Sequence, residues 1–280
     1  MLKLGISSLG LILDPIWSEK PKKLLDLFLN STEESLKLAE NERLKVCEII
    51  LDYPILSSEE NKKKFIELCE SYSIEKQIHG PFIDVSLCSH NDKISKASID
   101  SYIESAIICK EIGAKILTIH PGLANLVVNS INQFNMRRLI GAVKEILKAT
   151  EDLGVKICIE NMPKSINILL KTEDFNNFFS HFNGDDLYIT YDTAHYWTNV
   201  EDPTLFWQSF HNKIKNVHLV DNNTKDSDPH IALGKGKINF DLIFSLIKTY
   251  KYEGALIVEL NSKRALINGI NYVRNKLINF

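Results

Sequence analysis

The stretch ICIENMP, residues 157–163, carries the pattern that decides the fold of this chain. An apolar run, 157–159, is followed at once by the carboxylate of Glu160 and then by a turn ending at Pro163. Short apolar runs of this kind are typical of strands that are buried on both faces of a parallel sheet. A carboxylate at the end of such a strand must be ion-paired or metal-bound, because burying it alone is costly. Both a salt bridge to a lysine and a metal site are open at this point.

An apolar run followed by an amphipathic segment recurs along the whole chain. The candidate strands cover residues 2–7, 46–51, 76–79, 116–120, 157–160, 188–191, 216–219 and 255–259. The candidate helices begin near residues 31 and 58 and then cover 92–112, 132–153, 172–181, 203–212, 240–250 and 265–278. The first is expected to open with the capping box Ser31-Thr32-Glu33-Glu34, and Gly113 and Gly154 are expected to end two others.

This alternation of strands and helices predicts an α/β fold. Eight strands alternating with eight helices indicate a single (β/α)8 TIM barrel, as one domain over residues 1–280. The alternative is an open, doubly wound sheet, which usually carries a Gly-x-Gly-x-x-Gly loop after its first strand. The chain has no such loop after residues 2–7, so the barrel is favoured.

Composition favours a globular protein with a small substrate. The 280 residues are 44% hydrophobic and 25% charged, and 33 basic against 36 acidic residues give a net charge of -3. A protein that binds duplex DNA usually has a basic face, and no long basic block occurs in this sequence.

The cysteines and the N-terminus predict a cytoplasmic protein. The five cysteines are odd in number and form no Cys-x-x-Cys pair, which argues against disulfides and zinc knuckles. Residues 1–5 lack the pattern of a signal peptide, and no apolar run is long enough to span a membrane, so no membrane partner is expected. Nothing in the sequence indicates the oligomeric state.

Imidazole and carboxylate side chains lie at or just past the ends of the later candidate strands. Since the carboxyl ends of all strands in a (β/α)8 barrel meet at one rim, where enzymes of this fold keep their active sites, these side chains are expected to converge. The sequence therefore predicts a divalent-metal site formed by His79, His120, Glu160, Asp192, His195, His218, Asp228, His230 and Glu259.

Each motif also has a simpler interpretation. A histidine before a turn, as in His79-Gly80-Pro81-Phe82, is more often packed than metal-bound. Asp192 is a candidate helix N-cap, and Asp228-Pro229-His230 is a candidate hydrogen-bonded surface loop. Their recurrence at six successive strand ends is what favours metal binding.

Together these segments resemble the xylose-isomerase-like TIM-barrel superfamily, which includes the endonuclease IV family and the sugar phosphate isomerase and epimerase families. The resemblance rests, in chain order, on His79-Gly80-Pro81-Phe82, His120-Pro121-Gly122, Glu160-Asn161, Asp192-Thr193-Ala194-His195, His218, Asp228-Pro229-His230, Leu233-Gly234-Lys235-Gly236 and Glu259. It implies a barrel with a divalent-metal site at the C-terminal rim.

Resemblance to endonuclease IV implies three zinc ions and hydrolysis of abasic DNA. Glu160 then bridges two of the ions, and the remaining ligands divide into His79 with His120, then Asp192, His218 and Glu259, and finally His195, Asp228 and His230. Clustered metals suit this reaction because they activate water and stabilise the leaving oxygen.

Resemblance to the epimerases implies one ion instead. Its ligands are Glu160, Asp192, His218 and Glu259, and the two glutamates double as acid and base on a ketose. Two features favour this branch. Phe82 stands where the endonucleases typically have a tyrosine facing DNA, and the loop 52–58 contains no arginine.

Four further residues are expected to contact the substrate. Trp17, Phe82 and Trp197 are candidates for stacking on a sugar ring, and Lys235 for meeting a phosphate, although packing under the loops and solvation are alternatives. The sequence thus predicts an isomerase or epimerase of a small sugar or sugar phosphate that uses one to three divalent ions, Zn or Mn. The alternatives are an endonuclease IV-like hydrolase that binds nucleic acid and a barrel that binds metal without turnover.

Overall fold

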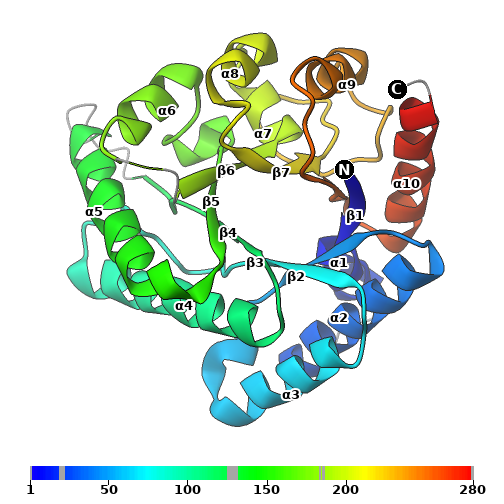
Figure 1. The fold of residues 1–280 in the computed structure, drawn as a ribbon, viewed down its shortest axis with the longest axis horizontal. Helices are drawn as coiled ribbons and strands as arrows, with labels where there is room; N and C mark the ends of the chain where they lie inside the picture. The colour runs from blue at the N-terminus through cyan, green and yellow to red at the C-terminus, as the bar shows by residue number, and fades with distance from the viewer. Residues whose placement is uncertain (1, 19–22, 125–131, 183, 185–186, 279–280) are drawn as a thin grey trace.

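The computed structural model describes residues 2–18, 23–124, 132–182, 184 and 187–278, and its strands form one closed parallel barrel. Each strand pairs with the next in the chain, and β8 returns to pair with β1 (Figure 1). The strands are β1 (Lys3–Ser7), β2 (Val46–Ile50), β3 (Glu75–His79), β4 (Ile116–Ile119), β5 (Lys156–Glu160), β6 (Leu187–Asp192), β7 (Ile214–Leu219) and β8 (Ala255–Val258). The predicted (β/α)8 barrel is confirmed.

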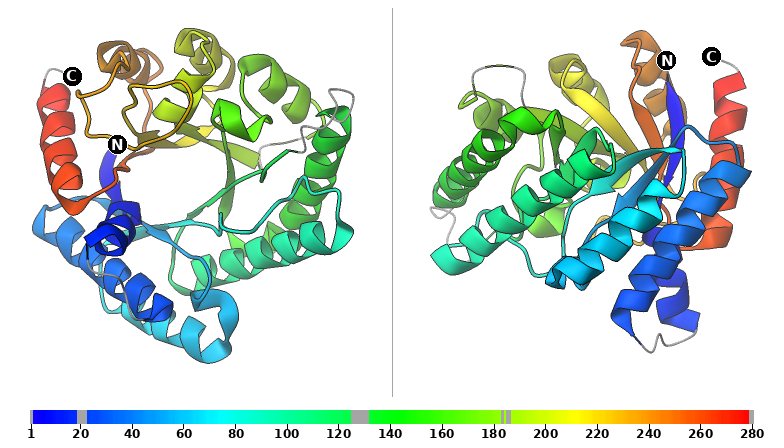
Figure 2. Two further views of the ribbon diagram at one scale, coloured as in Figure 1. Left: turned by 180° about the vertical axis from the view of Figure 1, so that it is seen from behind. Right: turned by 60° about the horizontal axis from the view of Figure 1, so that its bottom comes forward.

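Helices surround the barrel on its outside, as both views of Figure 2 show. Those that follow the strands are α2 (Leu24–Asn41), α3 (Glu59–Glu70), α4 (Asp92–Glu111), α5 (Asn132–Thr150), α6 (Thr172–Phe179), α8 (Pro203–Phe210), α9 (Phe240–Thr249) and α10 (Lys263–Ile278). Short 3-10 turns cover Ile55–Ser57, Glu151–Leu153 and Lys164–Ile166. Gly113 and Gly154 have positive φ angles of 72° and 68°, as expected of glycines after a helical segment.

The predicted start of α2 is wrong. The helix begins at Leu24, and Ser31 lies buried within it, where its Oγ donates a hydrogen bond to the carbonyl of Leu11 at 2.6 Å. Apolar residues at 24, 25, 27 and 28 extend the helix towards its N-terminus, so the serine serves packing and not capping. The helix expected to begin near residue 58 does begin there, because Ser58 caps α3 by accepting a hydrogen bond from the Asn61 amide.

Two helices in the loops were not predicted. α1 (Leu9–Ser18) follows β1 directly and lies beside α2 and α10 near the barrel rim (Figure 2). Its internal Pro15 argues against a helix in any local analysis of the sequence. α7 (Thr193–Thr198) is a short helix that Asp192 caps, since its side chain accepts a hydrogen bond from the His195 amide at 2.7 Å. The N-cap reading of Asp192 is therefore correct.

The interior of the barrel is polar just below its C-terminal rim. Thr118 of β4 and Thr190 of β6 share a hydrogen bond of 2.8 Å, and Asn216 of β7 donates one of 2.6 Å to Glu48 of β2. Both bonds join strands that are not neighbours, so they cross the interior. Interiors of this fold are usually filled by branched apolar residues, so buried polar groups at this level need a reason.

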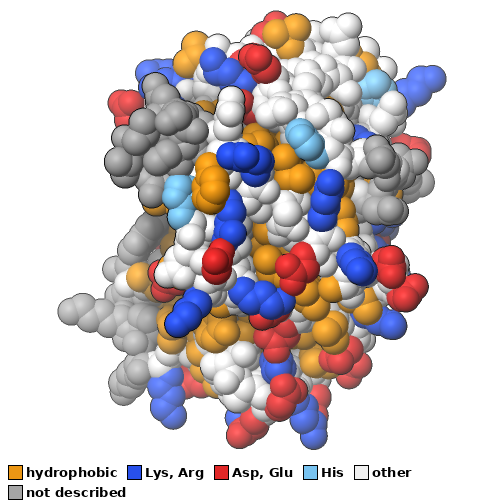
Figure 3. All heavy atoms as spheres, turned by 90° about the vertical axis from the view of Figure 1, so that its left-hand side faces the viewer, with side chains coloured by type: hydrophobic (Ala, Val, Ile, Leu, Met, Phe, Trp, Pro, Cys, Tyr) orange, Lys and Arg blue, Asp and Glu red, His pale blue; other side chains and the backbone are white. Residues whose placement is uncertain are grey.

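Three further features concern the cysteines, the helices and the surface charge. All five cysteines are buried and unpaired. Within the described ranges, no helix combines the length and apolar character that a bilayer crossing would require. On the face drawn in Figure 3, acidic and basic side chains are interspersed and form no continuous basic patch.

Candidate metal centre

The barrel brings the nine candidate ligands to one end. His79, Glu160 and Asp192 are the last residues of β3, β5 and β6, and His218 lies in β7. The remaining five follow strand ends or occupy the adjoining α7 and loops; they are His120, His195, Asp228, His230 and Glu259. Because all strands are parallel, these positions share one rim, and the side chains fall into neighbouring groups.

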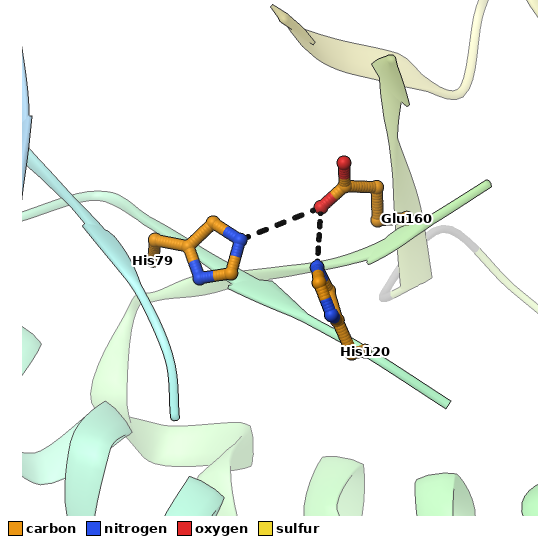
Figure 4. A group of neighbouring side chains, drawn as sticks. All are labelled: His79, His120 and Glu160. Atoms are coloured by element: carbon orange, nitrogen blue, oxygen red, sulfur yellow. Dashed lines mark hydrogen bonds and ion pairs between the residues drawn. The ribbon is translucent and has the colours of Figure 1, made fainter. Parts of the chain in front are cut away.

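The first group contains two imidazoles that face one carboxylate. Oε2 of Glu160 lies 2.8 Å from Nε2 of His120 and 3.5 Å from Nε2 of His79 (Figure 4). Nδ1 of His79 donates a hydrogen bond to the Gly80 carbonyl at 2.8 Å, which leaves Nε2 unprotonated when the ring is neutral. The turn after β3 thus prepares His79 to act as a ligand.

The second group lies on α7 and on the loop after β7. Oδ2 of Asp228 is 2.8 Å from Nε2 of both His195 and His230. The carbonyl oxygen of Asn161 orients the His195 ring, because it lies 3.0 Å from Nδ1 of that ring. This group adjoins Glu160, whose Oε1 is 3.2 Å from His195 Nδ1.

The third group centres on one nitrogen. Nδ1 of His218 lies 2.8 Å from Glu259 Oε2, 3.3 Å from Glu160 Oε1 and 3.9 Å from Asp192 Oδ2. Asn161 holds Asp192 in place, since its side chain exchanges two hydrogen bonds with the Asp192 backbone. Three carboxylates from three different strand ends therefore converge on a single imidazole.

The sequence analysis missed Glu48. Its Oε1 lies 2.8 Å from Nε2 of His218, on the side of the ring away from the three carboxylates, and both side chains are fully buried. Glu48 lies in the middle of β2, whereas ligands were expected only at the ends of strands. The sequence signal that could have identified Glu48 is a charged residue within the apolar run 46–51.

Burial and neighbouring imidazoles shift the pKa values of the carboxylates in opposite directions. Burial disfavours the charged form of Glu160, but the imidazoles of His218 and His120 hold its pKa well below the usual range. Burial likewise opposes ionisation of Glu259, yet His218 lowers the pKa of Glu259 to about 2. In Asp192 burial prevails and raises the pKa to about 7. Glu160 and Glu259 are therefore ionised at neutral pH.

The histidines balance this negative charge. Burial disfavours the protonated form of His230, but Asp228 raises its pKa to about 9. The pKa values of His195 and His218 are also raised against burial, chiefly by Asp192 and Glu259 respectively. In the metal-free chain, protonated imidazoles thus supply the positive charge that the buried carboxylates require.

The donor set fits divalent metal ions. Two of its buried atoms, Asp192 Oδ2 and Asp228 Oδ1, have no hydrogen-bond partner among the described residues. Buried polar atoms are normally hydrogen-bonded, so unpartnered ones at the centre of such groups point to ions as their partners. Imidazole nitrogen with carboxylate oxygen suits Zn and Mn.

Comparison with known proteins identifies the family. A family model described as xylose isomerase-like TIM barrel matches residues 45–276. The chain belongs to this family. Its relatives include the uncharacterised protein MJ1311 of Methanocaldococcus jannaschii, which is 27% identical over 99% of this chain and 89% of that protein. Probable endonuclease 4 of Thermoplasma volcanium is 24% identical over 79% of this chain and 80% of that protein.

Solved structures share the whole fold of this xylose isomerase-like barrel. The crystal structure of a D-tagatose 3-epimerase-like protein matches this chain with a TM-score of 0.82 and 24% sequence identity. The match covers 99% of this chain and 97% of the epimerase-like chain. The superfamily that the sequence analysis recognised is therefore confirmed, with both of its branches represented among the similar proteins.

A cavity of about 490 Å³ opens above the candidate ligands of this xylose isomerase-like barrel. Phe82 lines it, and its contact with a substrate stays a prediction. Trp197 and Lys235 are not among its described lining residues; Lys225 covers the Trp197 ring, and Lys235 is exposed in the loop after β7. Trp17 lies at the end of α1, and its side chain is outside the described part of the structure.

Proposed function

We propose that the chain is a divalent-metal-dependent isomerase or epimerase of a small sugar or sugar phosphate. The observation that carries this proposal is the convergence of Glu160, Asp192 and Glu259 on His218 Nδ1, within 3.9 Å. These four side chains would hold one ion between them. They lie at the floor of the rim, the part of a (β/α)8 barrel where active sites are built.

The reaction would be a proton transfer at the carbon next to a carbonyl. When bound, the divalent ion supplies the Lewis acidity that weakens this C–H bond. One ionised glutamate, Glu160 or Glu259, takes the proton, and the electron pair of the broken bond moves towards the carbonyl oxygen. The proton returns from the same glutamate, or from the other one when that carries a proton. Ser7 keeps Glu259 in position by donating a hydrogen bond of 3.1 Å to it.

A second candidate is a zinc-dependent hydrolase of abasic DNA. It is favoured by the additional group of Asp228 with His195 and His230, which would hold a further ion, and by the similarity to endonuclease 4. It is disfavoured by the cavity, because no lysine or arginine is found among the described residues that line it. Proteins that bind DNA rely on such cations to neutralise phosphates.

Two measurements on the purified protein test the proposal. Metal analysis should find one equivalent of divalent ion that is needed for turnover, and NMR in D2O should show deuterium entering a ketose beside its carbonyl. Metal-dependent nicking of an abasic duplex, without deuterium exchange on any ketose, would replace the proposed reaction with the hydrolytic one.

A further inference from the structure

The cavity above the candidate ligands has an apolar wall. Seven of its described lining residues are polar, and all seven belong to the ligand groups already described. Every other described lining residue is apolar, and these residues come from α1, α2, the end of β2 and the loops after β3 and β5. The cavity therefore has a polar floor beneath an apolar wall.

Part of this wall is exposed apolar surface. Leu24 is 54% exposed, Ile83 is 50%, Ile16 is 40% and Phe82 is 37%, and all four line the cavity. Large apolar side chains gathered at one concave site are typical of a surface that is covered when a ligand binds. Burying them would stabilise a complex by about 25 cal/mol per Å² of apolar surface.

A fully hydroxylated sugar matches this wall poorly. Once its metal-binding end lies on the floor, its remaining hydroxyl groups face leucine, isoleucine and phenylalanine side chains. Among the described lining residues no serine, threonine, asparagine, glutamine, lysine or arginine is present to accept or donate a hydrogen bond. Each hydroxyl left without a partner would weaken binding by about 5- to 150-fold.

We infer that the substrate is an α-hydroxy ketone that carries an apolar substituent, an alkyl or aryl group, beyond its metal-binding end. The inference rests on the proposed proton-transfer function and extends its substrate class beyond fully hydroxylated sugars. The adjacent carbonyl and hydroxyl oxygens reach the floor at Glu160 and Glu259, and the apolar group lies against the wall formed by α1 and α2.

A ligand series tests this inference by binding alone. Calorimetry on the Mn-loaded protein would compare hydroxyacetone, its homologues with longer unbranched alkyl chains, and a fully hydroxylated ketohexose. We expect affinity to rise about fourfold with each added methylene group, and the ketohexose to bind more weakly than an alkyl homologue of similar size. A flat series, with the ketohexose binding tightest, would overturn the inference.

Variants of the wall provide a matched control. Leu24→Gln and Ile83→Gln place a polar group in the wall, whereas Leu205→Gln changes a similarly exposed leucine, 51% exposed, on α8. The two wall variants should reduce the affinity gained per methylene group, and the control should keep it. Equal slopes in all three variants, with unchanged melting temperatures, would overturn the role of the wall.

Deuterium exchange on the same compounds separates this inference from the proposed function. Affinity that depends on chain length, without exchange on any compound, would support the apolar site and reject proton transfer. Exchange on the ketohexose combined with a flat alkyl series would support proton transfer and reject the apolar substituent.

Discussion

Nε2 of His218 lies 2.8 Å from Oε1 of Glu48, while Nδ1 of the same ring faces Glu259 at 2.8 Å. Glu48 is itself fixed, because its other oxygen accepts a hydrogen bond from Asn216. A carboxylate behind a ligating histidine sets which ring nitrogen carries the proton and raises the basicity of the other. Glu48 thus makes Nδ1 of His218 the nitrogen that is available to an ion.

The first prediction concerns Glu48→Gln. The substitution keeps the size of the side chain but removes the charge that orients His218, so metal affinity should fall by about 10- to 100-fold. Competition with a chromophoric chelator measures this affinity. Glu75→Gln is the control, since Glu75 pairs with Lys3 at the opposite end of the barrel. Unchanged affinity in Glu48→Gln would refute the orienting role.

The second prediction concerns the two glutamates assigned to proton transfer. Glu160→Gln and Glu259→Gln should each abolish deuterium exchange while the fold is retained, because an amide can neither bind the ion as an anion nor accept the proton. Exchange rates would be measured with circular dichroism as the check on folding. Either variant with normal turnover would lose its assigned role.

The third prediction separates the two reactions. Asp228→Ala combined with His230→Ala should remove one metal group and leave His218 and the three carboxylates around it intact. We expect the variant to keep one equivalent of divalent ion and part of the isomerase turnover, measured by metal analysis and deuterium exchange. A hydrolase that relies on clustered ions would lose nearly all of its rate. Abasic-site nicking by the unmodified protein that disappears in the double variant would contradict the proposed function.

The fourth prediction concerns the metal-free protein at alkaline pH. His230, with a pKa raised to about 9, stabilises the fold fully below its ordinary value of 6.5, and this contribution is lost as the pH rises through 9. The pKa of Asp192 is raised from 3.8 to about 7, so this group lowers stability progressively between pH 3.8 and pH 7. Both signs agree, and the melting temperature of chelator-treated protein should fall between pH 6 and 9.

Two comparisons make this pH prediction specific. Added metal should flatten the dependence, because the ion replaces the protons as the source of positive charge. The variant without Asp228 and His230 should also have a flatter profile between pH 7 and 9, since it lacks His230, the group of this pair that titrates in that range. A metal-free protein whose melting temperature rises over this range would show that the assigned charge balance is wrong.

Much of the fold could be predicted because it depends on local pattern. Strands such as β5 appear as apolar runs, and the polar residues at their ends had to meet once the strands were parallel. The start of α2 was misjudged at Ser31, because a serine has the same local signature at a helix cap and within a buried helix face. α1 was missed because of Pro15.

The sequence by itself determined the order of the strands, the rim to which the ligands belong and the family. Only the tertiary structure decided that Glu48 lies behind His218, because β2 and β7 are far apart in the chain and face each other across the interior only when the barrel closes. The apolar wall of the cavity was likewise decided only by the tertiary structure. Nothing in the sequence distinguishes Leu24 and Ile83 from other apolar residues. They line the same cavity only because separate segments of the chain pack around it.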